Sequence, residues 1–156
     1  MMRALCIATW TVLASCSGAH RPGALAKTMQ GSEFRALLER LAAGWNAGDS
    51  RASADCFTAS AIYVEPPRKQ LYVGRDALYM FFGGDQGRRG EMQMRWNSIV
   101  FDPAQQRGMG EFTFRYGTQV HGVAVIDVSD GRIAQWREYW YESEKPFEQF
   151  VEPSRP

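Results

Sequence analysis

Two segments of the sequence place carboxylic acids beside aromatic side chains in a pattern suited to proton transfer. Side chains alternate between the two faces of a strand, so the first expected strand carries Tyr63 and Glu65 on one face. The segment GRIAQWREYWYES repeats the pattern with three alternate residues: Trp136, Glu138 and Trp140. A carboxyl group enclosed by aromatic rings is poorly solvated, so its pKa rises, and a second acid nearby separates the two pKa values further. One acid would then act as a base while its neighbour stays protonated as a donor.

Two polar residues of the middle strands, Glu111 and His121, are candidates for the same site. Histidine titrates near neutrality and would act as either acid or base. Aromatic walls with a few convergent polar groups are typical of a site for a small, partly apolar molecule. We therefore predict three catalytic residues, namely Glu65 as base, with His121 or Glu138 as acid. The residues predicted to contact the ligand are Tyr63, Trp45, Glu111, Trp136 and Trp140.

Each of these residues also has a purely structural interpretation. Glu111 would pair with cross-strand neighbours on a solvated face, and Glu138 would pair with an arginine of an adjacent strand. His121 would be a hydrogen-bonded core histidine. The two tryptophans of the last strand would serve equally well in the core or in a dimer interface.

Composition excludes some classes of partner. Lys and Arg total 18 against 17 Asp and Glu, so the chain has no basic surplus with which to hold a nucleic acid. The scattered His and Glu residues lack the spacing typical of a zinc site, and we expect no metal and no cofactor. Cys56 has no expected partner for a disulfide and is predicted to be a buried apolar side chain.

The N-terminal segment has the features of an export signal. Its apolar run follows one arginine and is too short to span a bilayer as a permanent helix. The sequence Leu-Ala-Ser-Cys that ends at Cys16 resembles the bacterial lipobox, which predicts a signal peptide over 1–15 and a lipidated Cys16 followed by a tether over 16–31. The protein would then be anchored by lipid in the bacterial cell envelope. Ordinary secretion is one alternative, and a cytoplasmic protein that starts at Met29 is the other.

The remainder, residues 32–152, is expected to form one domain. A helix capped by Ser32 is predicted from the apolar spacing, followed by a shorter helix over 50–57 and a third helix from 75 to 82. Period-two alternation and turn residues predict strands over 61–65, 71–73, 91–101, 108–117, 118–128 and 132–141. The expected fold class is α+β, with a curved antiparallel sheet wrapped around three N-terminal helices.

Five short motifs in this order resemble the SnoaL-like, nuclear transport factor 2-like superfamily. The motifs are Trp45-Asn46-Ala47-Gly48-Asp49, Ala61-Ile62-Tyr63-Val64-Glu65-Pro66, Gly74-Arg75-Asp76-Ala77, Glu111-Phe112-Thr113-Phe114, and Asp130-Gly131-Arg132-Ile133 with Trp136-Arg137-Glu138-Tyr139. The resemblance implies a cystatin-like cone around a conical pocket, and it implies a homodimer. Members include isomerases, dehydratases, cyclases, epoxide hydrolases and non-catalytic binders.

Individual residues match two kinds of enzyme in the superfamily, each only in part. Glu65 matches the proton-shuttling aspartate of ketosteroid isomerases, but Leu41 stands where those enzymes carry a tyrosine. Their second donor falls near His121. Tyr63 and Glu138 match residues that hold water in limonene epoxide hydrolases, whereas Glu65 replaces their asparagine.

Three functions are compatible with these residues. The first is acid-base catalysis on a small hydrophobic or polyketide-like molecule. The second is capture of such a molecule, without catalysis, by a lipid-anchored protein. The third is a dimeric interaction module whose cavity is filled by its own side chains.

Overall fold

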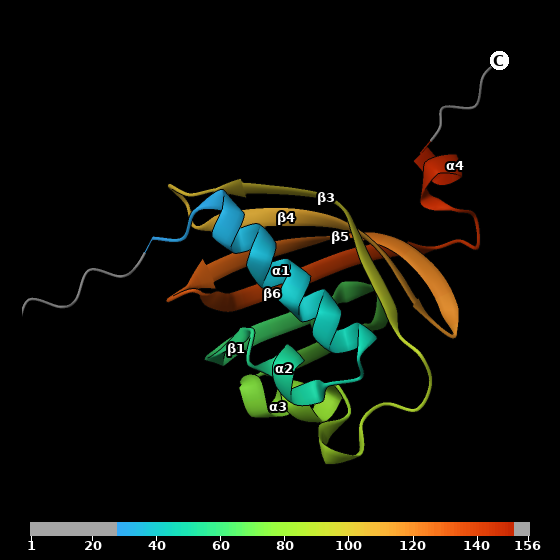
Figure 1. Ribbon diagram of the computed structural model, residues 1–156, viewed down its shortest axis with the longest axis horizontal. Helices are drawn as coiled ribbons and strands as arrows, with labels where there is room; N and C mark the ends of the chain where they lie inside the picture. Colours follow the sequence, from blue (N-terminus) through green and yellow to red (C-terminus); the bar gives the residue numbers. More distant parts are fainter. Residues whose placement is uncertain (1–27, 152–156) are drawn as a thin grey trace, which may run out of the picture.

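A curved six-stranded sheet with a long helix lying across it forms the body of the protein (Figure 1). The computed structural model describes residues 28–151. The predicted signal peptide, Cys16 and most of the predicted tether lie outside the described residues. The α+β class and the curved sheet with N-terminal helices are confirmed.

The described residues form three helices and six strands, followed by a short helix that stands apart from the sheet in Figure 1. The helices are α1 (Gly31–Asn46), α2 (Ser50–Ala54), α3 (Arg75–Phe81) and α4 (Phe147–Val151). The strands are β1 (Phe57–Glu65), β2 (Gln70–Val73), β3 (Gln93–Asp102), β4 (Arg107–Tyr116), β5 (Thr118–Ser129) and β6 (Arg132–Glu142). Short 3-10 turns follow β1 at Pro66–Arg68 and precede β3 at Gly84–Gln86.

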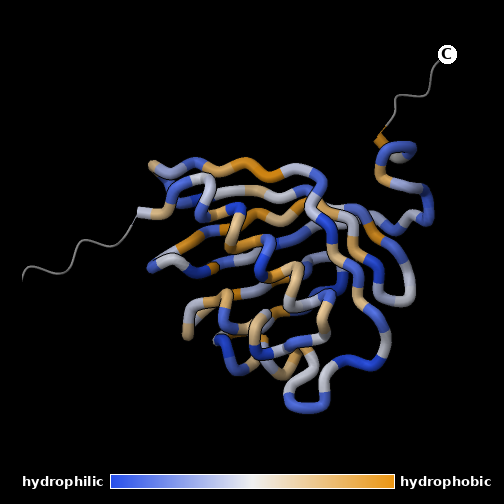
Figure 2. The backbone as a smooth tube through the Cα atoms, in the orientation of Figure 1, coloured by the Kyte–Doolittle hydropathy of each residue, from blue (hydrophilic) through white to orange (hydrophobic). Residues whose placement is uncertain are grey.

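The strand order in the sheet is β2-β1-β6-β5-β4-β3. Neighbouring strands are antiparallel except for β1 and β6, which run parallel. The parallel pair sets Tyr63 opposite Trp136, so that the first and last strands meet in the middle of the sheet. Hydrophobic residues concentrate in the strands, whereas the loop between α3 and β3 is mostly hydrophilic (Figure 2).

Helix α1 packs its apolar face against the inner face of the sheet. Phe34, Leu37, Leu38, Leu41 and Trp45 recur at three- and four-residue spacings and are all buried. The side chain of Asn46 joins the end of the helix to β3, accepting from the Met94 amide at 2.5 Å and donating to the Met94 carbonyl at 3.0 Å. These two hydrogen bonds fix the end of α1 against β3, and both Trp45 and Met94 belong to the core between them.

Several predicted boundaries are wrong, and β1 in particular begins at Phe57 rather than at Ala61. The N-cap of α1 is Gln30 rather than Ser32, and the Gln30 amide donates to Glu33 Oε2 at 2.9 Å. The second helix ends at Ala54 because β1 begins at Phe57 and pairs with β6. Cys56 therefore lies in a turn, although it is buried as expected.

Candidate functional site

A cavity of about 140 Å³ lies between α1, α3 and the inner face of the sheet. A cavity of similar size is known to hold a benzene-sized ring. Its apolar walls are formed by Trp45, Phe81, Phe82, Met92, Met94, Phe112, Phe114, Val120 and Trp140. Its polar lining consists of Tyr63, Glu65, Arg68, Gln70, Arg88, Tyr116, Thr118 and Glu138.

The two acids and the tyrosine meet in a buried part of this lining. The hydroxyl of Tyr63 is 3.2 Å from Glu138 Oε2 and 3.4 Å from Glu65 Oε1. Each carboxyl belongs to a residue that is only 8% exposed. Trp136 Nε1 donates to Glu138 Oε2 at 2.8 Å, so the same oxygen receives the indole and faces the phenol.

Strand geometry explains why these side chains converge. Tyr63 and Glu65 are two residues apart on β1, and Trp136 and Glu138 are two residues apart on β6, so each pair shares a face. The parallel pairing of β1 with β6 then brings the two pairs together, with the rings of Tyr63 and Trp136 stacked at 5.6 Å between centroids. Pro66 begins a 3-10 turn directly after Glu65 and ends the strand there.

Burial raises the pKa values of all three groups. The pKa of Glu138 rises to about 8, chiefly because burial disfavours its charged form and then because Glu65 is close. The pKa of Glu65 is also raised by burial, but Arg68 and Arg88 act in the opposite direction. At neutral pH Glu138 therefore holds a proton that it can donate, beside a second carboxyl whose charged form is favoured by Arg68 and Arg88.

Tyr63 remains a neutral donor under these conditions. Burial, reinforced by the charges of Glu138 and Glu65, holds the pKa of Tyr63 well above its ordinary value. Its hydroxyl can therefore donate to either carboxylate without losing its proton.

The predicted tryptophans occupy different positions around the acid pair. Trp45 and Trp140 line the cavity, as expected. Trp136 is only 1% exposed and lies behind Glu138. Its indole donates a hydrogen bond to the acid and does not line the cavity. Its ring packs edge-on against Trp45, with centroids 5.9 Å apart.

Glu111 and His121 were expected in the cavity, and the structure places both on the opposite face of the sheet. Phe112 and Val120 line the cavity, so their strand neighbours Glu111 and His121 point outward. His121 Nδ1 lies 3.0 Å from Thr113 Oγ1, and its Nε2 lies 2.9 Å from the carbonyl oxygen of Lys145. The cavity lining, rather than alternation alone, decides this placement, and on the opposite face His121 is buried at 4% exposed.

Sequence reasoning missed the two arginines of the lining. Arg68 lies in the turn after β1, with its guanidinium 5.2 Å from the centroid of the Trp140 ring. Arg88 lies in the loop before β3, 4.6 Å from the Phe81 ring and 5.4 Å from the Tyr116 ring. Neither segment has a periodicity from which the direction of a side chain follows.

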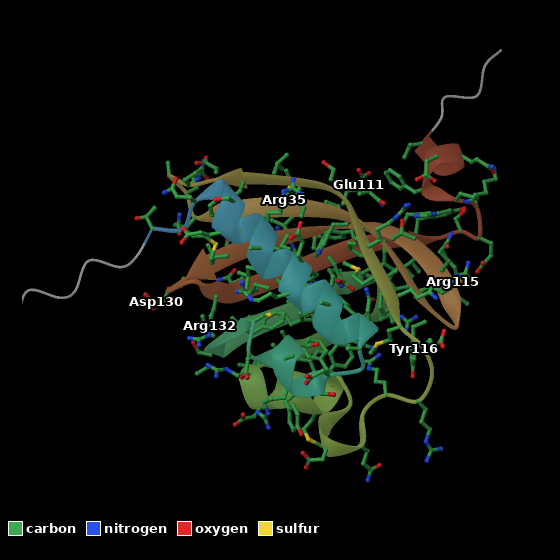
Figure 3. All side chains as sticks on the ribbon, in the orientation of Figure 1. Arg35, Glu111, Arg115, Tyr116, Asp130 and Arg132 are labelled. Carbon is green, nitrogen blue, oxygen red and sulfur yellow. The ribbon has the colours of Figure 1, made fainter. Side chains whose placement is uncertain are left out.

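The exposed members of the lining mark the mouth of the cavity. Arg68 and Thr118 are exposed, and Tyr116 is half-buried beside them in the lining. Figure 3 shows Tyr116 at the end of the sheet opposite Asp130 and Arg132. The mouth therefore lies toward the turn that joins β4 to β5.

Residues 28–151 contain no group of three or more His, Cys, Asp or Glu side chains able to hold a metal ion. No helix within the same span is long and apolar enough to cross a membrane.

Comparison with known proteins gives one family match. The sequence model of a family described as SnoaL-like domain matches residues 38–136. No match was found among curated proteins.

Solved structures share the fold at low sequence identity. An NTF-2 like protein of unknown function from Burkholderia xenovorans LB400 is 21% identical with a TM-score of 0.61, over 78% of this chain and 95% of that one. A putative ketosteroid isomerase from Kribbella flavida DSM 17836 is 19% identical with a TM-score of 0.62, over 81% and 92% of the two chains. An LEH-like epoxide hydrolase from Mycobacterium tuberculosis is 21% identical with a TM-score of 0.61, over 71% and 84%.

Proposed function

Because the chain belongs to the SnoaL-like domain family, as the order of its motifs predicted, we propose that its cavity catalyses acid-base chemistry on a small hydrophobic molecule. The reaction would be of the isomerase, dehydratase or cyclase type. The observation that carries this proposal is the buried acid pair joined by the Tyr63 hydroxyl, in which the pKa of Glu138 is raised to about 8 while Arg68 and Arg88 oppose the rise in the pKa of Glu65. Pairs of carboxyl groups whose pKa values are driven apart are a recurrent source of acid and base assignments.

Each group has a distinct role in the proposed mechanism. Glu65 faces the cavity as a carboxylate and removes a proton from a carbon of the bound molecule. Glu138 donates a hydrogen bond to the oxygen on which negative charge develops. Tyr63 lies within reach of both carboxyls and holds them in place. Each positioned acid or base is typically worth ~10² to 10⁴-fold in rate.

This arrangement differs from that of a ketosteroid isomerase. Leu41 is fully buried where those enzymes are expected to carry a tyrosine, and His121, near their second donor, points outward. Glu138 is the inward-facing group that can replace the missing donors. The Kribbella flavida structure, described as a putative ketosteroid isomerase, supports the reaction class but not the identity of the substrate.

A model reaction tests the base without knowledge of the substrate. The probe 5-nitrobenzisoxazole loses its ring C–H proton to a base, the freed electron pair completes a nitrile, and the N–O bond breaks to leave a coloured phenolate. Glu65 would take the proton, and Glu138 would donate to the phenolate oxygen. We expect turnover of this probe in the purified protein, measured by absorbance of the phenolate.

Matched variants identify the base. Glu65→Gln should lower the rate by ~10²-fold or more. Glu111→Gln carries the same change on the outer face and should leave the rate unchanged. A rate that Glu65→Gln does not alter would contradict catalysis by this pair, and the non-catalytic ligand-binding function would then take its place.

The outer face of the sheet supports a second proposal, that the protein forms a homodimer. Val100, Met109, Val123 and Tyr139 are exposed, at 54%, 46%, 37% and 46% respectively, on strands β3 to β6. Apolar residues gathered on one face are typical of an interaction surface. Sedimentation should show a dimer that Tyr139→Arg dissociates, whereas a monomeric wild-type protein would contradict the proposal.

Export and lipidation of Cys16 are also proposals, and they rest on the sequence alone. The mass of the mature N-terminus tests them directly. A diacylated cysteine is expected at position 16. An unmodified N-terminus beyond that position would contradict lipidation, and a protein starting at Met29 would contradict export.

A further inference from the structure

We propose that the ligand of this cavity is a carboxylic acid carrying one apolar ring, with its carboxylate held between Arg68 and Arg88 at the mouth. This inference deepens the proposed function, because it assigns a substrate class to the same site. It depends on the two arginines, whereas the proposed catalysis depends on the acid pair.

The charges in the lining favour an anion. Its charged side chains are two arginines and two glutamates, with no lysine, aspartate or histidine. The pKa of Glu138 is raised to about 8, so this residue keeps its proton at neutral pH and the acid pair carries at most one negative charge. The two guanidiniums therefore exceed the pair by at least one positive charge. A ligand with a single negative charge would balance the cavity.

The two arginines are arranged to receive such a group. Both guanidiniums lie against aromatic rings, Arg68 against Trp140 and Arg88 against Phe81 and Tyr116. Stacking leaves the donor edge of a guanidinium available to a carboxylate. In the described part of the chain Arg68 makes no ion pair or hydrogen bond. Arg88 donates two hydrogen bonds, from Nε and from Nη2, and both go to the carbonyl oxygen of Phe81.

The rest of the cavity suits an apolar ring. The space of about 140 Å³ lies between Phe82, Phe112 and Phe114. This volume is close to that of an engineered cavity that binds benzene. A carboxylate at the arginines would leave the ring and its attached carbons facing Glu65 and Glu138. The arginines would therefore orient the molecule for the proposed proton transfer.

Arg68 and Arg88 have an alternative role, because both lower the pKa of Glu65. If that were their only role, the cavity would bind charged and neutral ligands equally well. The comparison of an acid with its amide separates the two explanations, since the two molecules have nearly the same shape.

The test is calorimetric titration of the purified protein with phenylacetate and with phenylacetamide at neutral pH. We expect phenylacetate to bind at least ~10-fold tighter, as is reasonable for a charge-assisted contact with two arginines. Arg68→Gln should remove most of this preference without weakening phenylacetamide. The double variant Arg68→Gln, Arg88→Gln should remove all of it. Arg137→Gln, on the outer face beside Glu138, is the matched control and should retain the full preference.

Equal binding of the acid and the amide by the wild-type protein would overturn the proposal. So would a preference that survives the loss of Arg68 in a variant with an unchanged melting temperature. Arg68→Gln is the decisive variant because Arg88 also bonds the backbone and its loss could affect folding.

The two proposals fail in different experiments. If Glu65→Gln abolishes turnover of 5-nitrobenzisoxazole while the acid and the amide bind equally, the catalytic proposal stands and the carboxylate proposal falls. If the acid is preferred but Glu65→Gln has no effect on turnover, the cavity binds a carboxylic acid without acid-base catalysis.

Discussion

The inner and outer faces of strands β4, β5 and β6 both carry charged side chains, but their surroundings differ. On the outer face Arg107 and Asp127 form an ion pair with Nη2 and Oδ2 2.9 Å apart, in contact with water. On the inner face Glu138 is buried, and its carboxyl is bonded by an indole and a phenol instead of a cation. The outer ion pair satisfies its own charges, whereas the inner acid retains a proton that it can donate.

This comparison shows that solvation, rather than residue type, determines which acids are able to do chemistry. Glu111 and Glu138 are the same amino acid on neighbouring parts of one sheet. Glu138 has a raised pKa because water is excluded from it and Glu65 lies beside it.

The largest expected effect concerns the pH dependence of stability. The pKa of Glu138 is raised from an ordinary value of 4.5 to about 8 in the folded protein, so the folded state binds its proton more tightly. Its contribution to stability is therefore fully present below the unfolded pKa and is lost as the pH rises through the folded pKa. Each pKa unit corresponds to about 1.4 kcal/mol, so the loss should be on the order of 4 kcal/mol.

Denaturant unfolding of the wild-type protein and of Glu138→Gln, at pH 5 and at pH 9, measures this effect. The variant should lose much less stability across that interval than the wild-type protein does. Glu111→Gln should follow the wild-type dependence. Parallel curves for wild type and Glu138→Gln would show that Glu138 titrates normally.

The second effect concerns packing beneath the cavity. A Cβ atom at Gly122 would lie 2.6 Å from the Tyr139 carbonyl oxygen, 2.6 Å from Phe112 Cζ and 2.8 Å from Trp140 Cβ. The backbone oxygen cannot move without displacing β6. Gly122→Ala should therefore lower the free energy of unfolding by about 3 kcal/mol.

The neighbouring residue provides the outer-face control for this prediction. Val123 is 37% exposed, and Val123→Ala should cost less than about 1 kcal/mol in the same unfolding experiment. If both substitutions cost the same, the inner face would be no more tightly packed than the outer one.

The third effect is the contribution of the Tyr63 hydroxyl. Tyr63→Phe removes a hydrogen bond that lowers the pKa of Glu65 and of Glu138. Both pKa values should rise, so the pH profile of probe turnover should move to higher pH. The rate at neutral pH should fall about tenfold, as is usual for the loss of one hydrogen bond to a charged group. An unchanged profile would remove Tyr63 from the mechanism.

The smallest expected effect is at His121. His121→Asn should leave probe turnover within about twofold of wild type, because the ring contacts Thr113 and Lys145 on the outer face. A large loss of turnover would mean that the outer face contributes to catalysis after all.

Much of the fold was predictable from local patterns. The apolar spacing of α1, the turn residues and the alternation in the strands are properties of short segments, and these elements lie where they were expected within a few residues. The limits of the second helix were less predictable. Pairing between β1 and β6 converts residues from Phe57 onward into strand, and such pairing joins segments far apart in the chain.

The candidate site was predictable only in part, for a related physical reason. Alternation establishes that Tyr63 and Glu65 share a face, and that Glu138 shares one with Trp136, because the period of a strand is two. The same rule divides β4 and β5 into two sets of side chains without indicating which set faces the helix. Phe112 and Val120 take the inner face, which places Glu111 and His121 outside.

Local sequence patterns therefore establish the elements, the order of the motifs and the side chains that share a face on each strand. Contacts between distant segments bring the acids of β1 and β6 together, place Arg68 and Arg88 in the same cavity, and turn Glu111 and the buried His121 to the opposite face of the sheet. Local patterns arise from backbone geometry within a few residues, whereas a shared cavity and the pKa values inside it depend on which distant segments exclude water together.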